Sequence, residues 1–184
     1  MFSQCLEMPL ATRLDMYADT FELTRLAQTI QGRTPIKQFE RLVQDLPEQA
    51  DTFVTWSIKG EVDVRGRLFL RVRVRATPIL ECQRCLGPME WPVDADNRLQ
   101  VVTSEAALDD ENVLDGDPDA LVERVVGSKR MDVLALVEDE IILSLPYVSK
   151  HDICPSLPTA LDEEPGVDAD RPSPFAALGR LKKN

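Results

Sequence analysis

Residues 65–76 read RGRLFLRVRVRA, and their alternating pattern is the strongest indication of the fold. Apolar side chains occupy every second position in its second part, at Leu68, Leu70, Val72, Val74 and Ala76. Successive side chains of a β-strand point to opposite faces, so the segment has one apolar face and one polar face. Burial on one side only is typical of an antiparallel sheet whose other side meets water.

The segments before and after this stretch alternate in the same way. Apolar residues take every second position at Val54, Trp56 and Ile58. The same spacing returns farther along the chain, at Val93, Ala95, Leu99 and Val101. We therefore predict an antiparallel sheet over residues 52–102.

Two other segments have helical spacing. The first helix is expected over 35–46, where Thr34 and Pro35 are start signals. The second is expected over 132–145, with Asp132 as its N-terminal cap. Helices that pack on an antiparallel sheet predict an α+β fold class with two to three helices.

The rest of the chain predicts the domain organisation. Residues 1–154 are expected to form a single α+β domain. Residues 104–119 contain seven acids and no base, which predicts a solvated loop. An acidic, proline-rich linker is expected over 155–172. A C-terminal amphipathic helix is expected over 173–184, with an apolar side of Phe175, Leu178 and Leu181.

The charge balance restricts the possible partners. The chain has 184 residues, and its 21 basic and 32 acidic residues give a formal net charge of -11. A field of this sign opposes general coating of RNA or DNA. A local basic face remains possible, because salt screens charges beyond about 10 Å.

The chain shows neither a secretory signal pattern nor an apolar run of the roughly 20 residues that a membrane helix needs. We therefore expect a cytoplasmic protein. Its four cysteines are then expected to be reduced or metal-bound, because disulfides are rare in that compartment.

The polar face of the opening stretch is rich in arginine. Arg65, Arg67, Arg71, Arg73 and Arg75 would all lie on it, with Phe69 among them. Guanidinium groups at this spacing are about 6.5–7 Å apart, which is close to the spacing of successive phosphates. We predict that these residues and Arg84 bind RNA phosphates while Phe69 stacks on a base. The alternative is ion pairing with acids of neighbouring strands, such as Glu61, Asp63, Asp94 and Asp96.

Two cysteine-containing pairs have equal spacing. Cys82 and Cys85 form a CxxC, and His151 and Cys154 form an HxxC. Together they would make a tetrahedral Cys3His site, and zinc is the metal that such ligands favour. The alternative is two unrelated pairs of reduced thiols. A thioredoxin-like role is disfavoured, because its CxxC begins a helix, whereas this one follows a strand.

Three consecutive acids occupy positions 138–140 of the second predicted helix. Neighbouring helix positions point about 100° apart, so these carboxylates should not converge on a magnesium or acid–base site. We predict that they form the solvated face of the helix or a partner surface. The single histidine lacks a nucleophile motif such as GxSxG, and neither a P-loop nor a GxGxxG is present. We expect no enzymatic activity.

Four segments, in this order, resemble the YceD family of large ribosomal RNA subunit accumulation proteins. They are LECQRCL (80–86), MDVLALVEDEIILSLP (131–146), HDICP (151–155) and PSPFAALGRLKKN (172–184). The resemblance implies a non-enzymatic bacterial factor in ribosome biogenesis. In many relatives the second pair resembles another CxxC. Either His151 replaces a thiolate here, or this chain has lost the metal and the turn around the CxxC pair remains only as part of the packing.

The function that we predict is a non-catalytic factor that supports synthesis, processing or accumulation of large-subunit ribosomal RNA. Its RNA contact would lie on the arginine-rich strand face. The alternative is an acidic adaptor that binds a basic ribosomal protein or an RNA-processing enzyme.

Overall fold

A computed structural model of the chain describes residues 17–108 and 122–155. The C-terminal helix expected over 173–184, nearly all of the linker and most of the acidic loop lie outside these ranges. Cys5 lies outside them as well. The organisation of residues 1–154 as one domain stays a prediction.

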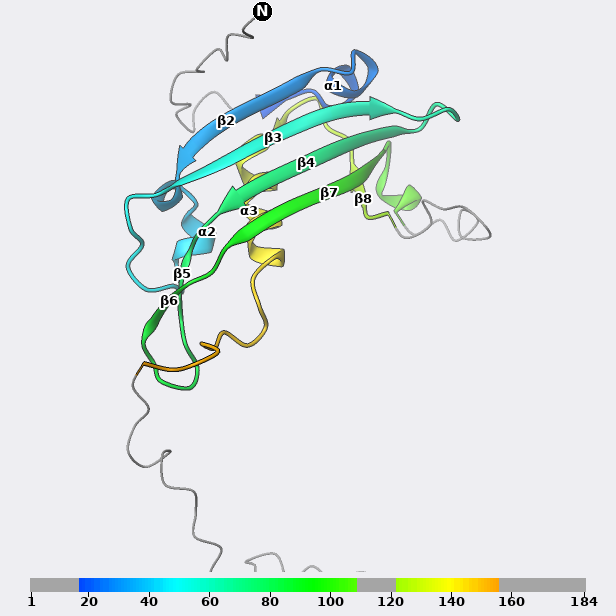
Figure 1. The fold of residues 1–184 in the computed structure, drawn as a ribbon. Helices are drawn as coiled ribbons and strands as arrows, with labels where there is room; N and C mark the ends of the chain where they lie inside the picture. The colour runs from blue at the N-terminus through cyan, green and yellow to red at the C-terminus, as the bar shows by residue number, and fades with distance from the viewer. Residues whose placement is uncertain (1–16, 109–121, 156–184) are drawn as a thin grey trace, which may run out of the picture.

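A five-stranded sheet with the order β2-β3-β4-β7-β8 forms the centre of the fold (Figure 1). Its strands are β2 (Thr29–Pro35), β3 (Phe53–Val62), β4 (Leu68–Ala76), β7 (Val93–Val102) and β8 (Arg124–Val126). The first four pair antiparallel, whereas β8 pairs parallel with β7. The α+β class is confirmed, and the sheet extends beyond the predicted range at both edges.

The helices α1 (Thr20–Arg25), α2 (Glu40–Val43) and α3 (Val133–Leu143) lie on one face of this sheet (Figure 1). Short 3-10 turns occur at η2 (Ile36–Gln38) and η3 (Glu105–Ala107). Two small pairings complete the described part, β1 (Tyr17–Ala18) with β9 (Met131–Asp132) and β5 (Ile79–Glu81) with β6 (Pro88–Glu90).

The predicted alternation is confirmed by burial. The helix-side face of the sheet is buried at Val54, Trp56, Ile58, Leu70, Val72, Val74, Ala76, Val93, Ala95, Leu99 and Val101. From α3 the same core receives Val133, Leu134, Val137 and Ile141. Burial of this apolar surface is the main source of stability, at about 25 cal/mol per Å². The opposite face of β2, β3, β4 and β7 carries the charged residues. We call it the outer face.

The second predicted helix is confirmed as α3, which ends at Leu143. Asp132 caps it by accepting a hydrogen bond from the backbone N–H of Ala135 at 3.0 Å. The predicted solvated face is wrong for Glu138 and Glu140, which are buried. Glu138 accepts hydrogen bonds from Arg41 Nε and from the backbone N–H of Leu42, both at 3.0 Å. These hydrogen bonds from α2 therefore offset the free-energy cost of burying the carboxylate.

The first predicted helix is much shorter than 35–46, because its supposed start belongs to a strand. Thr34 and Pro35 lie in β2, opposite Val54 and Phe53. The Thr34 side chain is buried, and its hydroxyl accepts a hydrogen bond from Trp56 Nε1 at 3.1 Å. Thr34 is therefore not a helix cap, and only η2 and α2 remain of the expected helix.

The sequence patterns also missed α1, which precedes β2. Asp19 caps this helix by accepting hydrogen bonds from the backbone N–H groups of Phe21 and Glu22. Gly60 permits its close packing on β3, because a Cβ there would lie 2.1 Å from the carbonyl oxygen of Leu23. Gly60 is thus a site of close approach within a strand.

Candidate functional site

The CxxC lies in a knuckle between β5 and β6, beyond one end of the large sheet (Figure 1). The loop closes through hydrogen bonds from Cys82 N to the Gly87 carbonyl at 2.9 Å and from Leu86 N to the Cys82 carbonyl at 2.8 Å. Leu86 has a φ of 57°, in the left-handed region. This compact turn directs both thiols of the CxxC to the same side.

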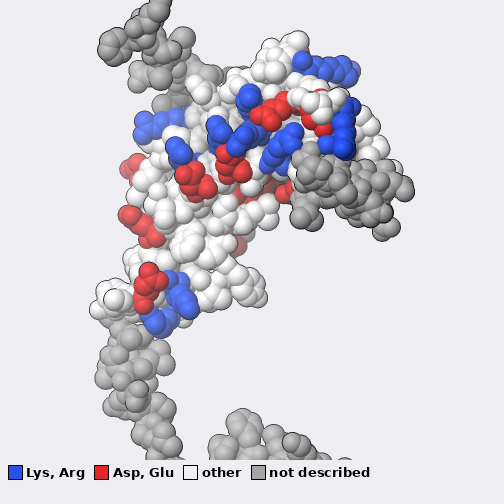
Figure 2. All heavy atoms as spheres, turned by 45° about the vertical axis from the view of Figure 1, so that its right-hand side comes forward, with Lys and Arg blue, Asp and Glu red and all other residues white. Residues whose placement is uncertain are grey.

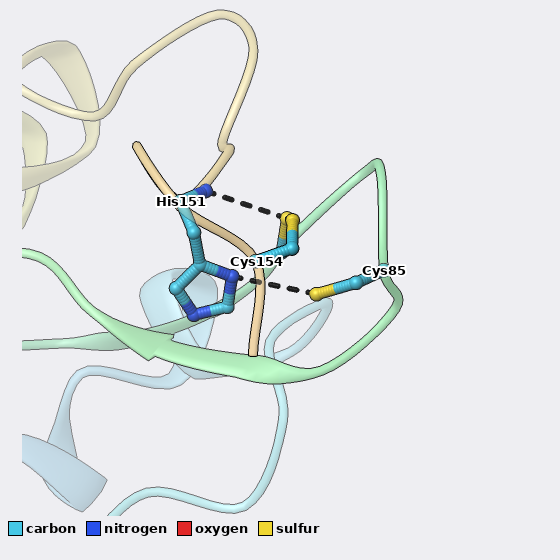
Figure 3. Close-up of side chains that lie close together, drawn as sticks. Cys85, His151 and Cys154 are labelled. Carbon is cyan, nitrogen blue, oxygen red and sulfur yellow. Dashed lines mark hydrogen bonds between the residues drawn. The ribbon is translucent and has the colours of Figure 1, made fainter. Parts of the chain in front are cut away.

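The chain beyond α3 brings the second pair to the knuckle. The Gln83 N–H donates to the Ser149 carbonyl at 2.8 Å, and the Ser149 hydroxyl donates to the Glu81 carbonyl. These contacts place His151 and Cys154 beside the hairpin (Figure 3). Segments about 70 residues apart in sequence therefore meet at one point.

The four predicted metal ligands form one cluster, in which all ligand atoms lie within 4.8 Å of one another. The sulfurs of Cys82 and Cys154 are 3.8 Å apart, and Cys85 Sγ is 3.4 Å from His151 Nδ1 (Figure 3). Tetrahedral zinc, with bonds of about 2.3 Å to sulfur and about 2.0 Å to nitrogen, separates such ligand pairs by about 3.8 and 3.5 Å. The donor set and these two distances fit that metal.

The environment of Cys82 favours its thiolate. Burial opposes ionisation, but the backbone N–H groups of Cys85, His151 and Arg84 point at its sulfur and lower the pKa of the thiol to about 5. The pKa of Cys85 is raised, because burial and the neighbouring sulfurs of Cys82 and Cys154 outweigh the hydrogen bond from the Gly87 N–H. The neighbouring sulfurs therefore oppose a second thiolate, and a bound cation would offset that repulsion.

Arg84 also belongs to the knuckle. Its Nε donates to Cys154 Sγ at 3.0 Å, and its terminal nitrogen donates to the carbonyl of His151 at 3.0 Å. Cys154 raises the pKa of the guanidinium. These contacts hold the HxxC segment against the hairpin, at a distance from the arginines of β4.

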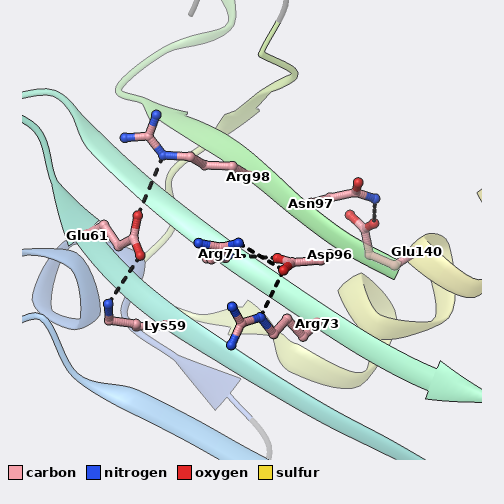
Figure 4. Close-up of polar contacts among 8 residues, drawn as sticks. All are labelled: Lys59, Glu61, Arg71, Arg73, Asp96, Asn97, Arg98 and Glu140. Carbon is pink, nitrogen blue, oxygen red and sulfur yellow. Dashed lines mark hydrogen bonds and ion pairs between the residues drawn. The ribbon is translucent and has the colours of Figure 1, made fainter. Parts of the chain in front are cut away.

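The arginines of β4 pair with acids of β7. Asp96 accepts from Arg71 Nε at 2.7 Å and from Arg73 Nε at 3.0 Å (Figure 4). Asp94 accepts from Arg75 Nε at 3.0 Å. The guanidinium groups of Arg71 and Arg73 lower the pKa of the Asp96 carboxyl to about 2, with Arg71 the larger cause. The predicted alternative of ion pairing across strands is therefore present.

Arg65 and Arg67 precede β4 and lie in the turn after β3, so the stripe on one strand is shorter than expected. Asp63 organises this turn by accepting from the N–H groups of both arginines, at 2.9 and 2.8 Å. Arg67 Nε also donates to Asp63 Oδ2 at 2.6 Å. Gly66 makes the reversal possible with a φ of 79°.

Phe69 lies on the outer face, but its side chain is 0% exposed. The guanidinium of Arg98 lies 3.6 Å from the centre of its ring, and that of Arg67 lies 5.5 Å from it. The ring is thus already engaged in cation–π contacts and offers no surface to a base in this structure.

Three further basic residues lie on the outer face and were not predicted from the sequence, namely Arg33, Lys59 and Arg98. Arg33 lies on β2 in register with Thr55, while Lys59 and Arg98 flank Arg71 on the neighbouring strands. Glu61 pairs with both Lys59 and Arg98, at 3.3 and 3.6 Å (Figure 4). The period-two position of Arg98 in β7 was the signal that could have found it.

The outer face of β2, β3, β4 and β7 therefore carries a surplus of three positive charges. Its basic residues are Arg33, Lys59, Arg71, Arg73, Arg75 and Arg98, and its acidic residues are Glu61, Asp94 and Asp96. Figure 2 shows both kinds of side chain intermingled over the sheet. A shallow hollow of about 400 Å³ lies among them, lined in part by Thr55, Ser57, Arg73 and Arg75.

Comparison with known proteins decides the family. The family model described as "Large ribosomal RNA subunit accumulation protein YceD" matches residues 70–182, which is more than half of the chain. The chain belongs to the YceD family. A YceD protein of Haemophilus influenzae with the same description is 30% identical over 159 residues, which cover 83% of this chain and 86% of the relative. No solved structure matches the chain.

The family match includes the knuckle, α3 and the HxxC pair, which confirms the resemblance drawn from those segments. Arg33 and Lys59 of the outer face precede the matched range. Among the described residues, the longest apolar helices all fall short of what crossing a membrane requires.

Proposed function

We propose that this YceD-family protein supports the accumulation of large-subunit ribosomal RNA in the cytoplasm as a non-catalytic factor that contacts RNA through its outer face. The family description supports the process. The distribution of charge supports the contact. A chain of net charge -11 carries a surplus of three positive charges on this one face.

The arginine pairs of the outer face are compatible with phosphate binding. The side chains of Arg73 and Arg75 are 58% and 75% exposed, and each pairs with an aspartate through Nε. Exposed ion pairs contribute only about 0–1 kcal/mol, so a phosphate can compete for these groups at little cost. A guanidinium has five N–H donors, which leaves others for RNA.

Filter binding over a salt series tests the contact. The Arg73→Gln, Arg75→Gln double variant should bind large-subunit RNA at least tenfold more weakly. Arg25→Gln with Lys129→Gln is the matched control, because it removes two positive charges near α1 and should leave affinity within about twofold. Equal losses in the two variants, or none in either, would remove the outer face as the RNA site.

We further propose that the knuckle holds a structural zinc ion through Cys82, Cys85, His151 and Cys154. The fit of the four ligand atoms to a tetrahedral ion supports this proposal. When bound, the ion would join the β5–β6 hairpin to the segment beyond α3. Elemental analysis of protein prepared without added zinc should give about one equivalent, and a substoichiometric content would contradict the proposal.

The alternative function is a protein adaptor, and exposed apolar residues near the knuckle favour it. Leu86, Tyr147 and Ile153 are all largely exposed. Apolar side chains that project from a small rigid module commonly contact another protein. A pulldown with and without nuclease separates the two functions. Nuclease-resistant capture of a ribosomal protein or processing enzyme would favour the adaptor.

A further inference from the structure

We infer that the outer face recognises the phosphate backbone of double-helical RNA and not the bases of a single strand. This inference rests on the proposed RNA contact and adds the class of RNA. It follows from three features of the face, namely its aromatic residues, the layout of its cations and the lining of its hollow.

The aromatic residues of the outer face offer little surface for stacking. Within the described part of the large sheet, Phe53 and Phe69 are the rings that point to this face. Phe69 is 0% exposed, and the guanidinium of Arg33 lies 4.1 Å from the centre of the Phe53 ring. Proteins that bind single strands gain much of their affinity by stacking bases on exposed rings. With one ring buried and the other half-buried beneath an arginine, this face offers little of that affinity for a single strand.

The basic residues form a two-dimensional array. Lys59, Arg71 and Arg98 occupy one row across three adjacent strands. Arg33 and Arg75 share another row, separated by Thr55 of β3. With strands about 4.8 Å apart and residues about 3.4 Å apart along each strand, the array measures roughly 14 by 14 Å.

Such an array fits phosphates of two strands better than one extended backbone. A single line of arginines along β4 would follow one chain of phosphates, whereas cations on β2 and β7 extend the contact sideways. Double-stranded RNA presents phosphates on both sides of a wide, shallow minor groove, and proteins recognise it mainly by this shape. The outer face is a sheet surface with only a shallow hollow, so it can lie across such a groove.

The hollow among these cations has a polar lining of hydroxyl groups and ion pairs. Thr55 and Ser57 supply the hydroxyl groups, and Arg73 and Arg75 supply guanidinium groups. Asp94 and Asp96 also line the hollow and pair with these arginines, so a phosphate would take the place of a carboxylate there. Hydroxyls and guanidiniums are common donors to phosphate oxygens in nucleic-acid complexes. These contacts carry no base information, which agrees with recognition of the backbone.

Fluorescence anisotropy with the full-length protein tests the inference. The probes are a labelled RNA duplex of about 16 base pairs, long enough for a groove-spanning contact, and an unstructured oligouridine of equal length. We expect the duplex to bind at least tenfold more tightly. Lys59→Gln and Arg33→Gln should each weaken duplex binding and reduce the salt slope by about 1. Arg25→Gln is the single-charge control and should leave the slope unchanged.

The outcomes distinguish a failure of the inference about duplex RNA from a failure of the proposed RNA contact. If oligouridine binds as tightly as the duplex, the inference fails while the proposed RNA contact stands. If Lys59→Gln and Arg33→Gln leave the salt slope for the duplex unchanged, the two-dimensional array is wrong. If neither RNA binds, the proposed contact fails together with the inference. Thermal unfolding of each variant identifies any loss that comes from misfolding.

Discussion

The knuckle and the outer face differ in how their charged and electron-rich groups are arranged. In the knuckle, four ligand atoms from two distant segments converge within 4.8 Å. On the outer face, the acids of β3 and β7 pair with basic side chains and partly neutralise their charge. The first arrangement concentrates electron-rich groups to which a cation could bind. The second arrangement leaves a small surplus of positive charge and does not depend on a bound cation. The comparison suggests that the knuckle depends on a ligand for its shape, whereas the outer face depends on the core beneath it.

The largest expected effect is on the knuckle. Cys85→Ser removes one of the four ligands and should reduce bound zinc to well below one equivalent. Structural zinc is worth about 10–16 kcal/mol in small zinc domains at neutral pH, so the knuckle should open. Hydrogen exchange should accelerate in residues 79–90 and 146–155, while β3 and β4 stay protected. Equal acceleration in the large sheet would show that the two regions are not independent.

The core beneath the outer face should give the next largest effect. Ile58 is fully buried on β3, and Ile58→Ala should lower the free energy of unfolding by about 2–5 kcal/mol. Chemical denaturation measures this loss. RNA affinity should fall with the folded fraction, while zinc content of the folded protein stays at one equivalent. Loss of zinc from that folded protein would contradict the separation of the two regions.

Arg84 tests whether contacts around the ligands matter to the knuckle. Arg84→Ala removes the hydrogen bonds to Cys154 Sγ and to the His151 carbonyl. Loss of contacts of this kind typically weakens metal binding by about 10–100-fold. Competition of cobalt with a chelator, followed by the thiolate-to-cobalt absorption, measures the change. Arg75→Ala is the control, because Arg75 pairs with Asp94 on the sheet. If the two substitutions weaken metal binding equally, Arg84 acts only through its contribution to the overall charge of the protein.

The smallest expected effect is the pH dependence of the ion pairs on the outer face. The folded-state pKa of Asp96 is lowered to about 2, so its ionised form stabilises the fold. This contribution is full above the unfolded pKa of about 3.9 and is lost as pH falls toward 2. Denaturation of the protein and of Asp96→Asn should therefore differ slightly at pH 6 and converge near pH 2. A difference that persists at pH 2 would assign the effect of the substitution to something other than this charge.

The sequence was most informative where burial follows a local period. Val54, Trp56 and Ile58 were placed correctly on one face, because alternation depends only on the strand itself. Strand β2 was missed because its core-facing positions include Gly32 and Thr34. A Cβ at Gly32 would lie 2.5 Å from the Trp56 ring, so the glycine is required by a side chain of another strand.

The charged residues were harder to place for a related reason. Arg33 was missed together with β2, and Glu138 was expected in solvent although it is buried against α2. Whether a carboxylate can be buried depends on donors that arrive from elsewhere in the chain, here Arg41 and the Leu42 N–H. No period in the sequence of α3 contains that information.

The amino-acid sequence alone is enough to give the apolar face of the sheet, the cap of α3 and the equal spacing of the CxxC and HxxC pairs. These features depend on residues within one turn or one strand, where backbone geometry alone sets the direction of each side chain. The tertiary structure decided that the two pairs meet, that Arg84 holds them and that Phe69 is covered by Arg98. It also decided which arginines pair with which acids. These contacts join residues far apart in the chain, so they exist only once the sheet and the knuckle have brought their side chains within reach.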